Sequence, residues 1–147
     1  MTVLDAQAIV AFLVGEPTAP DVRAILERRD DQRLLSAANL AEVIDILVRS
    51  LGHPEAVVRE RLTWLEAGGV VTVDVDGDIG RSAGSLRARH YDRRSRPVSL
   101  GDCIALATAL RFRHVLATSA EPLVRAALSE GCDVLPLPDT GGRRPAV

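Results

Sequence analysis

The chain has no lysine, only two cysteines, and no hydrophobic run long enough to span a lipid bilayer. After Met1, residues 2–5 are Thr-Val-Leu-Asp, whereas a secretory leader would have a basic region followed by an apolar stretch at this place. Cys103 and Cys132 lack the close spacing of a zinc or redox pair, and a domain of this size does not need a disulfide. We therefore expect a cytoplasmic protein, without a membrane segment, in which both cysteines are buried thiols.

The length and composition fit a single domain. With 147 residues, of which 47% are hydrophobic, the chain can bury a substantial core. It contains no internal repeat, low-complexity block or linker, so any function must come from a site on one fold. We expect this domain to cover residues 1–138 and to be followed by a flexible tail at 139–147.

The charge is unevenly distributed. The formal net charge is −2, yet residues 81–96 hold six arginines against Asp92 alone, so this segment carries +5 and the remainder −7. The six are Arg81, Arg87, Arg89, Arg93, Arg94 and Arg96. They form either a solvated helix face or an edge that grips phosphate, because guanidinium groups pair with phosphate oxygens through two hydrogen bonds.

Short apolar runs alternate with helical patterns along the chain, which predicts an α/β fold with a parallel sheet. We expect strands at 3–4, 34–35, 70–73, 115–117 and 134–135. We expect helices at 6–13, 20–26, 40–51, 54–65, 79–91, from 99 onward, and at 123–128. In open sheets of this kind the functional site lies at the carboxyl ends of the strands.

Three acids lie next to core segments. Asp5 directly follows the first apolar pair, Glu42 lies inside an apolar helix, and Asp102 begins the apolar run 103–110. An ionised group removed from water is costly unless it is paired or bound to a metal. Each acid is therefore either a surface cap at the end of an element or part of a shared cation site.

Capping explains two of these acids when each is taken singly. Asp5 suits the N-cap of the following helix, which is worth about 1 kcal/mol. Ser99 and Asp102 have the spacing of a capping box, and an acid in the first turn gains roughly 0.3 to 1 kcal/mol from the helix dipole. Glu42 lies at the margin of an apolar stripe, where an exposed glutamate is common.

Taken together, the acids and their flanking residues resemble the PIN-domain ribonucleases, especially the toxin subunits of the VapBC type. The resemblance is carried by the segments 3–6, 36–43, 100–107 and 115–118. They occur in the family's order and extend over essentially the whole chain.

This resemblance implies a three-layer α/β/α PIN-like fold over residues 1–138, with a parallel central sheet of four to five strands. It implies that Asp5, Glu42 and Asp102 converge as catalytic residues and metal ligands that hold Mg²⁺, or Mn²⁺ as a substitute. Clustered carboxylates repel one another, which makes a divalent cation a fitting partner. The implied reaction is metal-dependent hydrolysis of RNA phosphodiester bonds, and the implied partners are RNA, a cognate antitoxin protein and a second copy of the chain.

One position departs from the family. Another acid usually follows the strand at 115–118, and Ala120 stands at the matching position. Glu121 is a candidate replacement ligand, and the Thr118 and Ser119 hydroxyls are candidates for contact with substrate or a metal-bound water, although Ser119 is favoured as a helix cap. The candidate phosphate-binding arginines are Arg93, Arg94 and Arg96.

Two other interpretations remain open. The first is a PIN-fold module that is catalytically weak or inactive and binds RNA or a protein. The second is a different α/β enzyme of phosphate chemistry, such as a receiver domain or a haloacid-dehalogenase-like phosphatase. The absence of lysine and of a second acid two residues after Asp5 counts against this second interpretation.

Overall fold

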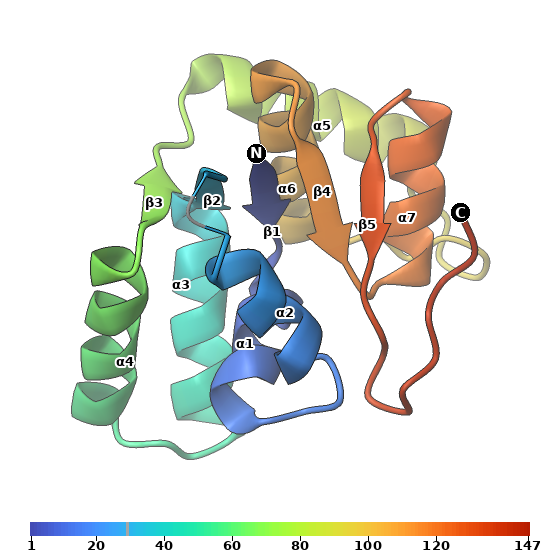
Figure 1. The fold of residues 1–147 in the computed structure, drawn as a ribbon. Helices are drawn as coiled ribbons and strands as arrows, with labels where there is room; N and C mark the ends of the chain where they lie inside the picture. Colours follow the sequence, from blue (N-terminus) through green and yellow to red (C-terminus); the bar gives the residue numbers. More distant parts are fainter. Residues whose placement is uncertain (29) are drawn as a thin grey trace.

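A five-stranded parallel sheet forms the centre of the protein in a computed structural model that describes residues 1–28 and 30–147 (Figure 1). The strand order is β3-β2-β1-β4-β5, and every neighbouring pair is parallel. The strands are β1 (Thr2–Leu4), β2 (Arg33–Ser36), β3 (Val70–Val73), β4 (Val115–Thr118) and β5 (Val134–Pro136). The predicted α/β class and the parallel sheet of four to five strands are confirmed.

Helices connect the strands and cover both faces of the sheet. They are α1 (Ala6–Val14), α2 (Ala19–Leu26), α3 (Ala37–Asp45) with the π-helical turn η1 (Ile46–Ser50), α4 (Glu55–Ala67), α5 (Gly77–His90), α6 (Leu100–Phe112) and α7 (Glu121–Ser129). Because successive strand residues point to opposite faces, the sheet supplies two cores. Val3, Leu34 and Leu116 pack with α5, α6 and α7, whereas the residues after them in sequence pack with α1 to α4. The result is the predicted three-layer α/β/α arrangement.

The order of the strands reverses at β1. This strand pairs with β2 on one side and with β4 on the other, and Leu4 lies in register with Ala117. Ligand sites of open α/β sheets lie outside the carboxyl ends of the strands at such a reversal. The fold therefore places Asp5, which follows β1, next to Thr118, which ends β4.

The segment predicted as one helix over 40–51 differs from the expectation. It forms α3 and then η1, in which the Leu51 N–H donates to the Ile46 carbonyl five residues earlier, at 3.0 Å. Gly52 then ends it with a left-handed backbone at φ 73°. A hydrophobic period near 3.6 residues cannot distinguish this wider turn from an ordinary helical turn.

The predicted flexible tail, 139–147, makes specific contacts. The Asp139 carboxylate accepts hydrogen bonds from the backbone N–H groups of Gly141 and Arg143, at 2.8 and 2.9 Å. Arg144 pairs with Asp21 at 2.6 Å and donates to the Pro136 carbonyl at 2.8 Å. These contacts attach the tail to α2 and to the end of β5.

Cys103 and Cys132 are buried and free, as predicted. Among residues 1–28 and 30–147, no helix combines the length and apolar character needed to cross a membrane.

Candidate functional site

Asp5 lies at the reversal of strand order and is 2% exposed. Its extended backbone ends β1, and its Oδ1 accepts a hydrogen bond from the Ala8 N–H at 2.7 Å, so the predicted N-cap of α1 is confirmed. A cap at a helix end is normally in contact with water, but here α1 starts inside the fold. The same carboxylate is thus both a cap and a buried acid.

Burial raises the pKa of Asp5 to about 7. The Thr118 side chain and the Ala8 N–H lower this pKa, whereas the charges of Asp102 and Glu42 raise it further. Like charges act in this way only when they lie near one another. The structure therefore brings Asp5, Glu42 and Asp102 into one acidic neighbourhood at the carboxyl edge of the sheet.

Asp102 lies in the first turn of α6 within the predicted capping box. The Ser99 hydroxyl accepts a hydrogen bond from the Asp102 N–H at 3.0 Å, and Asp102 Oδ2 accepts one from the Ser99 N–H at 2.7 Å. Burial raises the pKa of Asp102, and the hydrogen bonds with Ser99 oppose that rise. The cap interpretation is confirmed without excluding a role in the acidic neighbourhood.

Glu42 reaches the same region from α3. Burial and the charge of Asp102 raise the pKa of Glu42, and the Asn39 amide lowers it. A Cβ atom built on Gly101 would lie 2.5 Å from Glu42 Oε2. Glycine at 101 therefore allows the start of α6 to approach the Glu42 carboxylate.

Asn39 joins the two helices that carry Glu42 and Asp102, and sequence reasoning missed it. Its buried amide donates to the Gly101 carbonyl at 3.2 Å and to Glu42 Oε2 at 3.4 Å. The Ser36 hydroxyl donates to its Oδ1 at 2.6 Å. The available signal was an amide three residues before Glu42, a spacing that places both side chains on one helix face.

The three acids do not converge on one point as the family resemblance implies for metal ligands. Across residues 1–28 and 30–147, no three acidic, histidine or cysteine side chains are close enough together to hold a metal ion. Mutual repulsion favours separation of the carboxylates, and each has another partner: Ala8 for Asp5, Ser99 for Asp102 and Asn39 for Glu42. The three acids therefore lie in the same region, but their carboxylates are not close enough together to hold one metal ion.

The donor chemistry nevertheless suits a hard divalent cation. Each of the hydrogen bonds just described uses one oxygen of its carboxylate, and a carboxylate has two. Buried acids with raised pKa values gain most from a cation that offsets their charge. Movement of the Glu42 and Asp102 side chains toward Asp5 would supply oxygen ligands of the type that Mg²⁺ prefers.

The residues around the Ala120 position differ from the predictions. Ser119 does not cap α7, because Ala120 is the N-cap and has no side-chain hydrogen bond to the helix. Glu121 lies 3.6 Å from Arg125 in an exposed ion pair, and within residues 1–28 and 30–147 it forms no metal-sized group with two of the acids. Thr118 is fully buried, and its Oγ1 accepts the Ala120 N–H at 3.0 Å. Of the two hydroxyl residues, only Thr118 adjoins Asp5.

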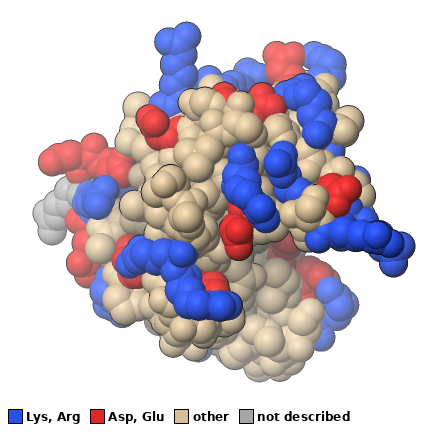
Figure 2. Space-filling view, turned by 90° about the vertical axis from the view of Figure 1, so that its right-hand side faces the viewer, with Lys and Arg blue, Asp and Glu red and all other residues tan. Residues whose placement is uncertain are grey.

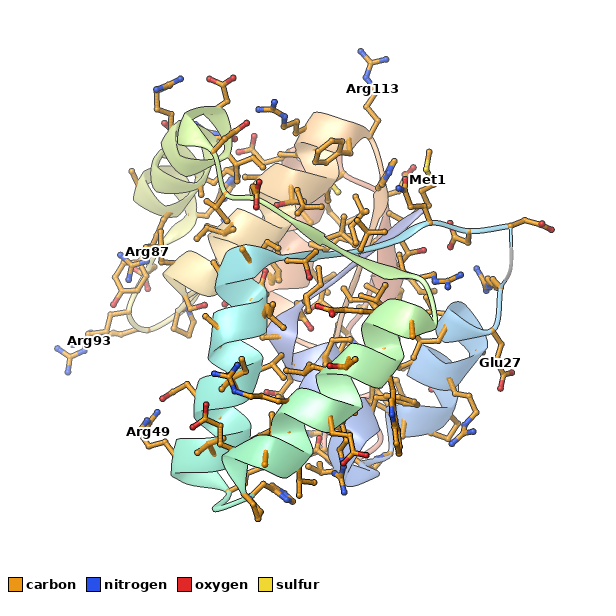
Figure 3. All side chains as sticks on the ribbon, turned by 90° about the vertical axis from the view of Figure 1, so that its left-hand side faces the viewer. Met1, Glu27, Arg49, Arg87, Arg93 and Arg113 are labelled. Atoms are coloured by element: carbon orange, nitrogen blue, oxygen red, sulfur yellow. The ribbon has the colours of Figure 1, made fainter. Side chains whose placement is uncertain are left out.

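The three candidate phosphate-binding arginines do not have the same surroundings. Arg93 extends from the loop after α5 and its side chain points into solvent (Figure 3). Arg94 is also exposed. Arg96 instead lies 3.0 Å from His90 Nδ1, and His90 Nε2 lies 2.5 Å from Glu130. Figure 2 shows arginines next to acidic side chains on the face that bears α7. Arg89 and Glu130 form an ion pair at 3.0 Å.

The sequence matches the family model of the PIN domain over residues 2–127. The chain belongs to the PIN-domain family. A curated relative, Ribonuclease VapC30 of Mycobacterium tuberculosis, is 32% identical over 108 residues, which are 73% of this chain and 80% of that protein. The pattern of acids described above is thus carried by a PIN domain.

Solved structures share the fold of this PIN domain. FitAcB from Neisseria gonorrhoeae has a TM-score of 0.67 at 23% identity, over 92% of this chain and 96% of that chain. VapC20 of M. tuberculosis, described as a sarcin-ricin loop cleaving toxin, has a TM-score of 0.62 at 18% identity, over 79% of this chain and 87% of that chain. At identities of 23% and 18%, the similarity establishes a shared fold only.

The raised pKa of Asp5 predicts a pH-dependent stability. The folded-state pKa of about 7 lies above the unfolded value, so between these pH values the folded state retains a proton that the unfolded state has released. The contribution of Asp5 to stability therefore falls as pH rises through this window and is constant above it. Asp5→Asn removes the titration while keeping the cap, so in chelator it should gain stability relative to the parent between pH 5 and pH 8, as measured by urea unfolding.

Asp76→Asn is the matched control. Asp76 caps α5 through the Ile79 N–H at 2.9 Å, but hydrogen bonding lowers its pKa. It is ionised in both states at pH 5 and above, so its substitution should change stability by the same amount at pH 5 and pH 8. If Asp5→Asn behaves in the same pH-independent way, Asp5 is not a buried acid with a raised pKa.

Proposed function

We propose that this PIN domain is a metal-dependent endoribonuclease that hydrolyses RNA phosphodiester bonds, and that it is the toxin of a type II toxin-antitoxin pair. The observation that carries the proposal is the group of three acids, from three separate elements, at the reversal of strand order. The relative VapC30 is named a ribonuclease, and the structural neighbour VapC20 is described as a toxin that cleaves the sarcin-ricin loop. Both names support ribonuclease activity.

The energetics of the acids favour a metal-dependent reaction over a purely structural role. A buried carboxylate with a pKa of about 7 costs stability at neutral pH, and asparagine would cap α1 without that cost. Such a cost is typical of functional sites. Asp5, Glu42 and Asp102 would hold Mg²⁺ or Mn²⁺, which supplies a Lewis acid that activates water and stabilises charge on the scissile phosphate.

The protein's own contribution is to position these acids. Asp5 is fixed by β1 and by its cap contact with α1, and Asp102 is fixed by the capping box of α6. Asn39 holds Glu42 and the Gly101 carbonyl together, so it sets the spacing between α3 and α6. These contacts fix the helices that carry the acids, whereas the Glu42 and Asp102 side chains would still have to move toward Asp5 to share a cation.

The surface of the protein supports RNA as a partner, and the structural neighbours support a protein partner. Arg93 and Arg94 are exposed and can reach phosphate oxygens, and Arg96 can do so after leaving His90. One structural neighbour is described as a toxin-antitoxin complex from Klebsiella pneumoniae, which supports a cognate antitoxin partner. A homodimer is part of the same proposal.

The second candidate function is a weakly active or inactive module that binds RNA or protein. Ala120 favours it, because this residue stands where the resemblance leads us to expect a further acid. The separation of the three carboxylates also favours it, since a cation would have to draw them together. Metal-dependent cleavage distinguishes the two functions.

Substituting the acids should separate catalysis from folding. We expect purified protein to cleave RNA only with Mg²⁺ or Mn²⁺, and Asp102→Asn or Asp5→Asn to reduce the cleavage rate by more than about 100-fold. Asn39→Ala should reduce it by about 10- to 100-fold, the range for residues that orient metal ligands. Gel-based rates with a defined RNA, together with circular dichroism, provide the measurement.

The control for this series is Asp76→Asn, which removes an exposed capping acid and should retain the parental rate. Cleavage that persists in excess chelator would contradict the metal-dependent mechanism. Parental rates in both Asp5→Asn and Asp102→Asn would favour a contaminating nuclease or another site.

Position 120 offers a second test with two substitutions. Ala120 is the uncapped N-cap of α7, so both Ala120→Asp and Ala120→Ser should add a cap worth about 1 kcal/mol. Only the aspartate adds a negatively charged carboxylate ligand near Thr118, whose side chain contacts Asp5. We expect Ala120→Asp alone to lower the Mg²⁺ concentration needed for half-maximal cleavage. An equal metal requirement in both variants would mean that the side chain at 120 faces the helix and not the acids.

A further inference from the structure

An open hollow lies between the end of α5 and the start of α6. It has a volume of about 330 Å³ and is lined by Gly84, Arg87, Ala88, Tyr91 and Leu100. Tyr91, the chain's one tyrosine, is 44% exposed, and Leu100 is 54% exposed. Gly84 and Ala88 have small side chains, so α5 contributes little bulk to its side of the hollow. An exposed ring beside an apolar side chain and small residues is suited to a flat ligand.

Arg87 and Tyr91 form one wall of this hollow. The Arg87 guanidinium carbon lies 4.4 Å from the centre of the Tyr91 ring, in a cation–π pair. Its buried Nε has no hydrogen-bond partner within the part of the chain that the structure describes. A planar ligand can extend this stack, and polar atoms at its edge can approach the guanidinium.

The hollow adjoins the acidic neighbourhood. Leu100 is the first residue of α6, Gly101 contacts Glu42 and Asn39, and Asp102 follows. Leu100 and Asp102 are two positions apart in the first turn of α6, so their side chains point to different sides of that turn. An RNA strand that crosses this turn with its backbone at the acids can place a base in the hollow on the other side.

The charge around the hollow favours a polyanion. Arg93 and Arg94 follow Tyr91 closely in sequence and are exposed, and Asp92 is the one acid among them. Arg87 and Arg93 project on the same side of the molecule (Figure 3), whereas Arg89 is paired with Glu130. A second copy of the chain packed here through a two-fold axis would bring these arginines against their own counterparts. Single-stranded RNA combines a negative backbone with flat bases that stack on tyrosine and arginine.

We propose that this hollow is a stacking subsite for an unpaired RNA base next to the scissile phosphate, with Tyr91 as its platform and Arg87 as its edge contact. The inference rests on the proposed ribonuclease function and adds to it a requirement for unpaired RNA. Stacking does not depend on the salt concentration in the way that phosphate contacts do. Tyr91 and the exposed arginines therefore contribute separable parts of the affinity.

The test measures binding of an unstructured single-stranded RNA of mixed sequence, in chelator, by fluorescence anisotropy at several salt concentrations, and cleavage of the same RNA with Mg²⁺. Tyr91→Ala should weaken binding about 5- to 150-fold, which corresponds to 1 to 3 kcal/mol per stacked base. Tyr91→Phe should bind within about twofold of the parent, and Tyr91→Leu should behave like the alanine variant. The salt dependence should be unchanged in all three variants.

Two controls complete the design. Trp64→Ala removes another exposed aromatic, 67% exposed on α4, and should not affect binding. The double variant Arg93→Gln with Arg94→Gln should lower the slope of log K against log salt by about 0.7 for each lost contact with a single strand. An RNA duplex of the same sequence should bind equally to the parent and to Tyr91→Ala, because its bases are not available for stacking.

Any of the following four results would overturn the inference. Parental binding by Tyr91→Ala, with parental cleavage, would remove the subsite while the ribonuclease function stands. If Tyr91→Leu binds RNA as tightly as the parent, general apolar contact and not stacking explains the affinity. A change from dimer to monomer in Tyr91→Ala, seen by light scattering, would assign the hollow to a second copy of the chain. A parent that neither binds nor cleaves single-stranded RNA would remove both the subsite and the proposed function.

Discussion

The electrostatic cost of placing Asp5 inside the fold is the constraint on which the rest of the site depends. Asp5 follows β1 at the reversal of strand order, where β4 passes directly alongside. Its burial raises its pKa to about 7, and the charges of Asp102 and Glu42 add to the rise. A protein selected only for stability would use asparagine at this cap, so the retained acid indicates a use for the negative charge.

The surrounding contacts hold these acids near one another despite their repulsion. Asn39 connects α3 to the first turn of α6, and Gly101 leaves room for the Glu42 carboxylate. Outside this acidic neighbourhood lie Tyr91 and a group of arginines that can attract and orient a polyanion. A surface with arginines that attract phosphate, together with acids that would otherwise repel it, suits the cation-assisted cleavage of RNA that we propose.

The sequence predicted much of this architecture because its signals are local. Strands appeared as short apolar runs, and the caps at Asp5 and Ser99 followed from residue type and spacing. The proximity of the three acids is different, since it depends on the strand order and on how α3 and α6 pack. The family resemblance suggested that proximity, whereas helical periodicity left Glu42 looking like an ordinary surface glutamate.

The features that the sequence analysis missed or predicted wrongly also depend on how distant segments pack together. Ser119 has the side chain of a cap, but β4 extends to Thr118 and shifts the start of α7, so the cap position falls on Ala120. The role of Asn39 depends on a carbonyl 62 residues away. The hollow at Tyr91 requires α5 and α6 to lie side by side, which no local pattern encodes.

The central claim is that Asp5, Glu42 and Asp102 bind a divalent cation together. Anomalous diffraction from crystals of the protein grown with Mn²⁺ tests it most directly. We predict a single strong peak at the carboxyl end of β1, within coordination distance of carboxylate oxygens of Asp5 and Asp102, with Glu42 turned toward it. Ordered Mn²⁺ elsewhere in crystals that show no peak beside Asp5 would contradict the account.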